Sequence, residues 1–224
     1  MKIVTFSGID GAGKSTQIRA LEAWLRQASF RPSLLTFWDD VVMFARFREF
    51  MSHNAFGGDR GVGSPDKPLH RRDKNVTAWP VTALRFCLYF ADAVNTRLVV
   101  RRLHKNDADV VIFDRYIYDE LANLPLHNWF VRIFIRLMLA IAPTPDVAYL
   151  IDADPVAALA RKPEYPLEFL RKNRDSYLAL SDLFGNITVI EPQSVLAMEL
   201  RAREAFQQTT SESSAEVSGI PALP

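Results

Sequence analysis

The feature that most constrains this chain is a glycine-rich segment near its start. The segment reads Gly8, Ile9, Asp10, Gly11, Ala12, Gly13, Lys14, Ser15 and Thr16. An apolar run with strand character precedes it at residues 2–6, and apolar residues recur at helical spacing behind it over residues 15–28. Two glycines bracket four residues, and a lysine and a serine follow. This spacing between a strand and a helix is typical of a phosphate-binding loop.

Each residue type in the loop has a mechanical reason. Glycines let the backbone bend so that successive N–H groups converge on an anion, which the positive end of the following helix also favours. Lys14 places a point charge between the phosphates of a donor, and Ser15 offers its hydroxyl to magnesium. A turn that only capped a helix would need neither the lysine nor the additional glycines. We therefore expect all nine residues to bind the triphosphate of ATP.

A second motif, Asp114, Arg115 and Tyr116, begins where a short apolar run at residues 110–113 ends. That run reads as a strand covered on both faces of a parallel sheet, so the motif belongs to the edge where open α/β folds bind ligands. Asp114 is suited to hold magnesium, and Arg115 to fork onto an acceptor phosphate or to stabilise charge during transfer. A surface salt bridge is the alternative.

The order of elements predicts an α/β fold. Further strands are expected at residues 33–38, 147–151 and 187–190. Helices are expected at residues 41–51, 81–103 and 129–142, followed by a short helix that ends at Arg161 and another that ends at Leu183. Alternating strands and helices imply right-handed crossovers and a parallel sheet covered on both sides. We expect one domain over residues 1–206, with a long irregular insertion at residues 52–80 and a disordered tail at residues 207–224.

Composition narrows the class of protein. With 224 residues, of which 49% are hydrophobic, the chain has enough apolar material for one core. A formal charge of +1 is no basic excess, so no nucleic-acid partner is expected. Cys87 stands alone, which excludes an intramolecular disulfide framework and suits a reducing, cytoplasmic setting. The longest apolar stretch, 129–142, is too short to cross a bilayer, and we expect Arg132 and Arg136 on its solvated face.

The two motifs, the run at residues 145–152 and the stretch at residues 169–177 resemble successive landmarks of the thymidylate kinases. The resemblance implies a three-layer P-loop kinase fold, with a five-stranded parallel sheet flanked by helices and a short lid near residues 161–168. It also implies frequent homodimers and transfer of the ATP γ-phosphate, with magnesium, to a deoxynucleoside monophosphate. dTMP is the default acceptor of that family.

The resemblance also assigns roles to single residues. Asp10 would lie near the acceptor sugar, and Arg161 would close over the donor as a lid arginine. An exposed helix end is the alternative for Arg161. Ala93 stands where the family has an arginine, one turn beyond the aromatic residue that corresponds to Tyr89. Arg97, one turn later, is the candidate substitute.

The segment after the second strand leaves the acceptor open. Phe37, Trp38, Asp39 and Asp40 stand where the family has a Glu-Pro-Gly-like turn. Either Asp39 or Asp40 could act as a general base toward a sugar hydroxyl, or could cap a helix starting at Val41. Arg71 and Arg72 are hypothesised to fold over the acceptor and supply phosphate contacts; a solvated loop is the alternative.

Together these patterns predict phosphorylation of a nucleoside monophosphate that depends on ATP and magnesium. The catalytic candidates are Lys14, Asp114, Arg115 and Arg161, and the metal candidates are Ser15 and Asp114. The acceptor-binding candidates are Asp10, Asp39, Asp40, Arg71, Arg72, Tyr89, Arg97, Arg115 and Tyr116. Two other functions remain open: a kinase of a nucleoside or another hydroxyl acceptor, and a non-catalytic nucleotide-binding protein.

Overall fold

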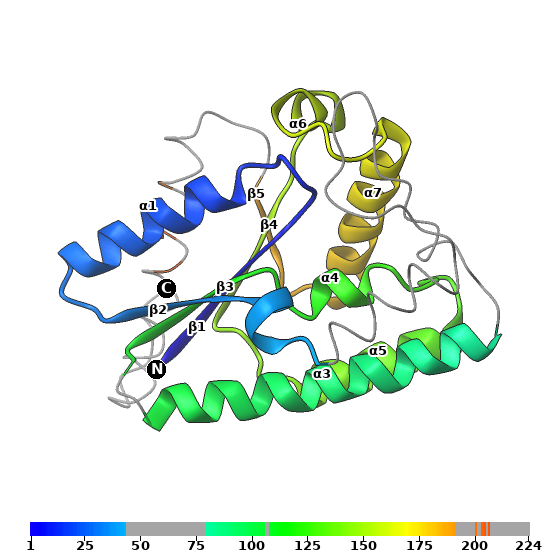
Figure 1. Ribbon diagram of the computed structural model, residues 1–224, viewed down its shortest axis with the longest axis horizontal. Helices are drawn as coiled ribbons and strands as arrows, with labels where there is room; N and C mark the ends of the chain where they lie inside the picture. The colour runs from blue at the N-terminus through cyan, green and yellow to red at the C-terminus, as the bar shows by residue number, and fades with distance from the viewer. Residues whose placement is uncertain (44–78, 106–107, 191–199, 201–202, 205, 207–224) are drawn as a thin grey trace, which may run out of the picture.

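The computed structural model describes residues 1–43, 79–105, 108–190, 200, 203, 204 and 206. Its centre is a five-stranded sheet in which every pairing is parallel, with the strand order β2-β3-β1-β4-β5 (Figure 1). The strands are β1 (Lys2–Ser7), β2 (Pro32–Thr36), β3 (Val110–Asp114), β4 (Val147–Ile151) and β5 (Thr188–Ile190). The predicted five-stranded parallel α/β fold is confirmed.

The middle strands are apolar because both faces of the sheet are covered. Every residue of β4 is buried, as is every residue of β1 after Lys2. In register, Asp114 at the end of β3 lies opposite Phe6 of β1 and Thr36 of β2. The carboxyl ends of these three strands therefore meet at one edge, which positions the loops that follow them.

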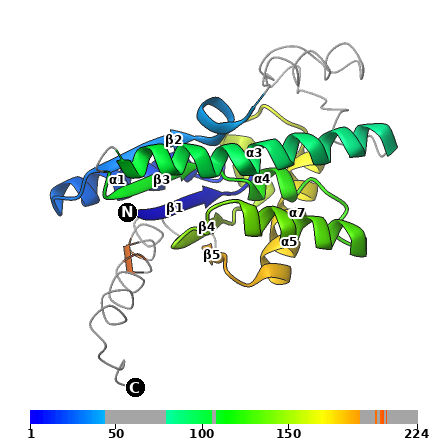
Figure 2. The ribbon, with the colours of Figure 1, turned by 90° about the horizontal axis from the view of Figure 1, so that it is seen from below.

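Helices form the two outer layers. They are α1 (Lys14–Gln27), α3 (Trp79–Lys105), α4 (Tyr118–Leu121), α5 (Trp129–Ile141), α6 (Pro155–Arg161) and α7 (Leu167–Phe184). Helix α1 lies on one side of the sheet, whereas α3 and α5 lie on the other (Figures 1 and 2). This arrangement gives the three layers expected from the sequence.

Helix α5 follows the expected amphipathic pattern. Asn128 caps it by accepting a hydrogen bond from the Phe130 N–H, and Val131 and Ile135 are buried. Arg132 and Arg136 are exposed, as expected, but so are the apolar Ile133 and Leu137 of the same helix. Among the described helices, none is both long and apolar enough to span a membrane.

The segment after β2 differs from the sequence prediction. The strand ends at Thr36 rather than at residue 38, and Phe37–Val41 form a π-helical turn, η1. The Asp40 carboxylate accepts a hydrogen bond from the Thr36 N–H at 2.7 Å, and the Phe37 ring is buried, so the chain bends instead of extending the strand. Val42 is extended, so no helix begins at Val41; the rest of the expected helix lies outside the described residues.

Two other boundaries were not foreseen. Helix α3 begins at Trp79, so it takes the last two residues of the irregular insertion expected at residues 52–80. The short helix α4 follows the Asp-Arg-Tyr motif and was not predicted. The remainder of the insertion and the expected tail at residues 207–224 lie outside the described residues.

Candidate active site

The phosphate loop packs its backbone directly against two neighbouring elements. Gly8 has φ +139°, and a Cβ added there would lie 2.5 Å from the carbonyl oxygen of Ile151 in β4. Gly11 has φ +78°, and an added Cβ would overlap the carbonyl oxygen of Ala158 in α6. Only glycine combines this backbone conformation with such close approach. The loop is thus held between β4 and α6 by its own main chain.

Lys14 lies inside the curve of the loop. Its side-chain ammonium donates hydrogen bonds of 2.9 Å to the carbonyl oxygens of Gly8 and Ile9, and only 7% of the residue is exposed. Burial, assisted by the positive charge of Arg115, lowers the pKa of Lys14 to about 8, while nearby carboxylates act in the opposite direction. The lysine is therefore a cation that an incoming polyphosphate would stabilise.

Asp114 lies close to that lysine. Its negative charge is one of those that partly oppose the lowering of the Lys14 pKa. Its carboxylate makes no hydrogen bond or ion pair with another described residue. The hydroxyl of Ser15 is exposed in the first turn of α1. A carboxylate and a hydroxyl are the hard oxygen ligands that magnesium takes, usually alongside substrate phosphates and water. These two residues suit the magnesium ion expected from the sequence.

Arg115 turns the chain back toward the loop at the end of β3. It adopts φ +70°, and its backbone N–H donates to the Phe6 carbonyl at 2.9 Å. Its guanidinium donates to Asp119 at 2.6 Å and to Asp10 at 2.5 Å. Burial opposes the charged form, but the carboxylate of Asp119 outweighs it and raises the pKa of Arg115 above its ordinary value. The arginine is thus a permanent cation beside the loop.

The sequence analysis did not identify Asp119, a buried carboxylate that accepts a hydrogen bond from the Arg115 guanidinium. Asp119 also accepts hydrogen bonds from the hydroxyls of Ser7, at 2.7 Å, and Tyr177, at 2.6 Å. Burial, followed by the charge of Asp119, raises the pKa of Tyr177 well above its ordinary value. The spacing of four residues from Arg115 was the available signal, but it was weak, because Arg115 precedes α4 and has φ +70°.

The expected lid cation Arg161 and the adjacent Lys162 border the loop at the end of α6. Arg161 is exposed, its Nε donates to the Ala157 carbonyl at 3.2 Å, and its Nη1 lies 3.9 Å from the position of a Cβ added at Gly13. The Lys162 ammonium lies 4.0 Å from the Asp10 carboxylate. Both cations are therefore next to the predicted donor site, as a lid role requires.

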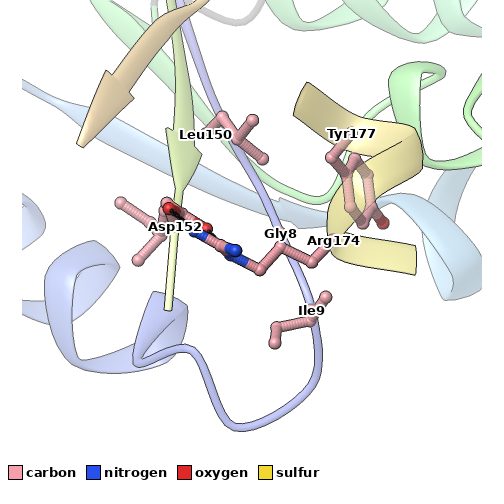
Figure 3. A pocket seen from close by; sticks show the side chains of 7 residues that line it. Gly8, Ile9, Leu150, Asp152, Arg174 and Tyr177 are labelled. Atoms are coloured by element: carbon pink, nitrogen blue, oxygen red, sulfur yellow. Dashed lines mark hydrogen bonds and ion pairs between the residues drawn. The ribbon is translucent and has the colours of Figure 1, made fainter. Parts of the chain in front are cut away.

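A small hollow lies beside the phosphate loop, between β4 and α7. It is lined by Gly8, Ile9, Leu150, Ile151, Asp152, Arg174 and Tyr177 (Figure 3). Across it, Arg174 of α7 donates two hydrogen bonds of 2.6 Å to Asp152, which follows β4 (Figure 3). This bidentate pair fastens α7 to the sheet beside the phosphate loop.

Two of three comparisons with known proteins find similarity to thymidylate kinases. No protein-family model matches the chain. A probable thymidylate kinase of Pyrococcus abyssi is 27% identical over 199 residues, which is 84% of this chain and 86% of the relative. One of Methanothermobacter thermautotrophicus is 28% identical over 193 residues, 83% and 84% of the two chains. The chain is thymidylate kinase-like.

Solved thymidylate kinases share the fold. The enzyme of Ehrlichia chaffeensis matches with a TM-score of 0.58 and 16% identity, over 92% of this chain and 98% of its own. The enzyme of Candida albicans matches with a TM-score of 0.61 and 15% identity, over 93% and 92%. The thymidylate kinase-like architecture thus extends over almost the whole chain.

This thymidylate kinase-like chain does not bring every acceptor candidate to the loop. Tyr116 is fully buried, and its hydroxyl donates to the Pro143 carbonyl at 2.5 Å, so its side chain belongs to the core and not to an acceptor site. Tyr89 is also buried on α3, close to the fully buried Ala93. Arg97 is exposed; burial raises the pKa of Tyr116 well above its ordinary value and the charge of Arg97 partly opposes this rise, so Arg97 lies near that part of the core.

The two acids after β2 are exposed on η1. Asp40 is engaged with the Thr36 backbone, whereas Asp39 makes no hydrogen bond or ion pair within the part of the chain that the structure describes. Neither caps a helix at Val41. Arg71 and Arg72 lie outside the described residues.

Proposed function

We propose that this protein transfers the γ-phosphate of ATP to a nucleoside monophosphate, with dTMP as the expected acceptor and magnesium as the cofactor. One observation carries the proposal: Lys14 and Arg115 meet at Gly8, whose carbonyl accepts from the lysine at 2.9 Å and lies 3.4 Å from the arginine. Two cations from different motifs thus converge where a donor and an acceptor phosphate would meet. The similarity to probable thymidylate kinases over most of the chain supports the same reaction.

Phosphoryl transfer asks the protein for positioning and charge stabilisation. In the proposed reaction an oxygen of the acceptor phosphate attacks the γ-phosphorus, and the bridging oxygen leaves with ADP. Loop amides and Lys14 hold the donor, while Arg115 orients the acceptor phosphate. Ser15 and Asp114 would hold magnesium, which neutralises phosphate charge when bound. Arg161 would close over the donor and help to exclude water.

A second candidate function is phosphorylation of a sugar hydroxyl. Its support is the position of η1, which follows Thr36, and Thr36 pairs in register with Asp114. The exposed carboxylates of Asp39 and Asp40 therefore begin close to the edge that carries the candidate metal site. A neutral alcohol must lose a proton during transfer, and either carboxylate would serve as the base.

An acceptor panel separates these reactions. ADP release is measured with dTMP, other nucleoside monophosphates and thymidine, for the wild type and for Asp39→Asn and Asp40→Asn. We expect dTMP to stimulate ADP release and both variants to keep turnover within about threefold of wild type, because an anionic acceptor needs no base. Stimulation by thymidine alone, with a loss of about 100-fold in one variant, would establish the hydroxyl kinase instead. Tight ATP binding with no stimulation by any acceptor would indicate a non-catalytic nucleotide-binding protein.

Two broader expectations also stand as proposals: a cytoplasmic location and a homodimer. The lone Cys87 suits a reducing compartment. Helices α3 and α5, which pack together, expose apolar side chains that include Phe90, Leu98 and Ile133, and a second copy would cover them. Light scattering during gel filtration tests the dimer, and substitution of Ile133 by Glu should yield a monomer.

A further inference from the structure

Asp119 is a buried carboxylate beside the phosphate loop that accepts four hydrogen bonds. Its Oδ2 accepts from the Ser7 hydroxyl at 2.7 Å and the Tyr116 N–H at 3.2 Å. Its Oδ1 accepts from the Tyr177 hydroxyl and from Arg115 Nη1, each at 2.6 Å. A carboxylate offers about four acceptor positions, so this set satisfies the group completely in its charged form. These four hydrogen bonds therefore hold the Asp119 carboxylate in one position.

The anchors of Asp119 come from separate parts of the fold. Ser7 ends β1 and directly precedes the phosphate loop, Tyr116 follows β3, and Tyr177 belongs to α7. These three donors would hold the carboxylate even without Arg115. Asp119 thus gives the arginine a position defined by the sheet and by α7, rather than by the flexibility of its own side chain.

Arg115 has two carboxylate partners that differ in exposure. The side chain of Asp119 is 1% exposed, whereas that of Asp10 is 23% exposed. An anion that enters the site can replace Asp10 on one guanidinium nitrogen, but it has no access to the side where Asp119 binds. Asp10 is the exchangeable partner of the arginine, and Asp119 is the permanent one.

We infer that Asp119 is a positioning residue, which holds the Arg115 guanidinium at the phosphate loop so that it meets the acceptor phosphate already oriented. The inference rests on the phosphoryl transfer proposed above. An arginine that is ordered before the substrate arrives loses less conformational entropy on binding and in the transition state. Asp119 itself touches neither substrate.

The direct test is a double-mutant cycle between Asp119→Asn and Arg115→Met, with γ-labelled ATP so that slow variants stay measurable. We expect Asp119→Asn to lower kcat/KM for the acceptor by about 10- to 100-fold and to leave KM for ATP within about twofold. In the Arg115→Met background the same substitution should cause no further loss, because it has no guanidinium left to position. An equal loss in both backgrounds, or no loss in the wild type, would overturn the inference.

A matched control breaks a different arginine–carboxylate pair, far from the phosphate loop. Asp109, just before β3, accepts from Arg31 at 3.0 and 3.1 Å, at the opposite end of the sheet from the loop. Asp109→Asn should leave the kinetic constants unchanged. If Asp119→Asn does not fold, Tyr177→Phe removes one hydrogen bond from the carboxylate and keeps the ring; we expect a smaller loss of acceptor kcat/KM, again absent with Arg115→Met.

A readout that needs no turnover separates this inference from the proposed function. In ¹⁵N NMR spectra, the N–H groups of a clamped guanidinium exchange slowly with water and give resolved signals. We expect such signals for Arg115 in the wild type and in Asp109→Asn, and their loss in Asp119→Asn or, in part, in Tyr177→Phe. Absence of dTMP turnover in the wild type would refute the proposed function alone. Unchanged Arg115 signals in folded Asp119→Asn would refute the positioning role, whatever the acceptor.

Discussion

Gly11 of the phosphate loop lies directly against the Ala158 carbonyl of α6, with no room for a side chain between them. The contact joins the donor site to the helix whose last residue is Arg161, the candidate lid cation. The absence of a side chain at Gly11 therefore sets how closely α6 approaches the phosphate loop.

A methyl group at Gly11 should separate the loop from α6. We predict that Gly11→Ala weakens ATP binding by about tenfold or more and lowers the melting temperature, because the added Cβ overlaps backbone atoms that cannot rotate away. Isothermal titration and thermal melts measure the two effects. Gly185→Ala is the matched control, since Gly185 also has positive φ, at +64°, but an added Cβ there meets nothing within 4 Å. It should lose about 1 kcal/mol of stability and no ATP affinity. Equal effects of the two substitutions would contradict the packing argument.

The lowered pKa of Lys14 predicts a pH dependence of ATP binding. A polyphosphate needs the charged ammonium, and in the free protein this form is lost as the pH rises through about 8. We expect the ATP dissociation constant to rise by roughly tenfold between about pH 7.5 and about pH 9, a range in which ATP itself stays fully ionised. Lys14→Met should bind more weakly and show no such rise. A flat profile in the wild type would contradict the assignment of Lys14.

The lowered pKa of Lys14 also predicts that the ligand-free protein becomes more stable as the pH rises. Because the folded-state pKa lies below the ordinary value of 10.5, the unfolded chain binds more protons between these two values. The free energy of unfolding should therefore rise with pH from about 8 toward 10 relative to Lys14→Met. Urea denaturation of both proteins across this range measures the difference.

Asp114 should matter for magnesium and for turnover more than for folding. Asp114→Asn keeps the shape of the side chain but removes the charge, so we predict a fall in kcat of about 100-fold and a higher half-saturating magnesium concentration. It should also move the pH midpoint of ATP binding downward, since Asp114 supports the charged form of Lys14. Asp146→Asn, at the amino end of β4, is the control and should change none of these quantities. Wild-type magnesium dependence in Asp114→Asn would exclude Asp114 as a metal ligand.

The strands that carry the site could be predicted because their sequences are uniformly apolar and end at the motifs. The expected runs at residues 110–113 and 147–151 differ from β3 and β4 by at most one residue. The turn at Phe37 could not be predicted, because the pair Phe37 and Trp38 suits a strand as well as a turn. The turn depends on the hydrogen bond that the Asp40 carboxylate accepts from the Thr36 N–H. Local hydrogen bonding by a side chain outweighed the strand pattern there.

The chemistry of the site was only partly visible in the sequence. The loop and the Asp-Arg pair are contiguous motifs, so the residue types near the phosphates could be named. The partners of Asp119, which holds Arg115, come from positions as far apart as Ser7 and Tyr177, and only the folded sheet brings them to one carboxylate. Tyr116 shows the converse, because a polar residue inside a motif satisfied its hydroxyl in the core instead.

The most direct test of this account is the transfer of labelled phosphate from γ-labelled ATP to dTMP in the presence of magnesium. The account predicts labelled dTDP with the wild type, and about 100-fold less with Lys14→Met at the same ATP concentration. Failure to form labelled dTDP by a wild-type protein that binds ATP, or equal formation by Lys14→Met, would contradict it.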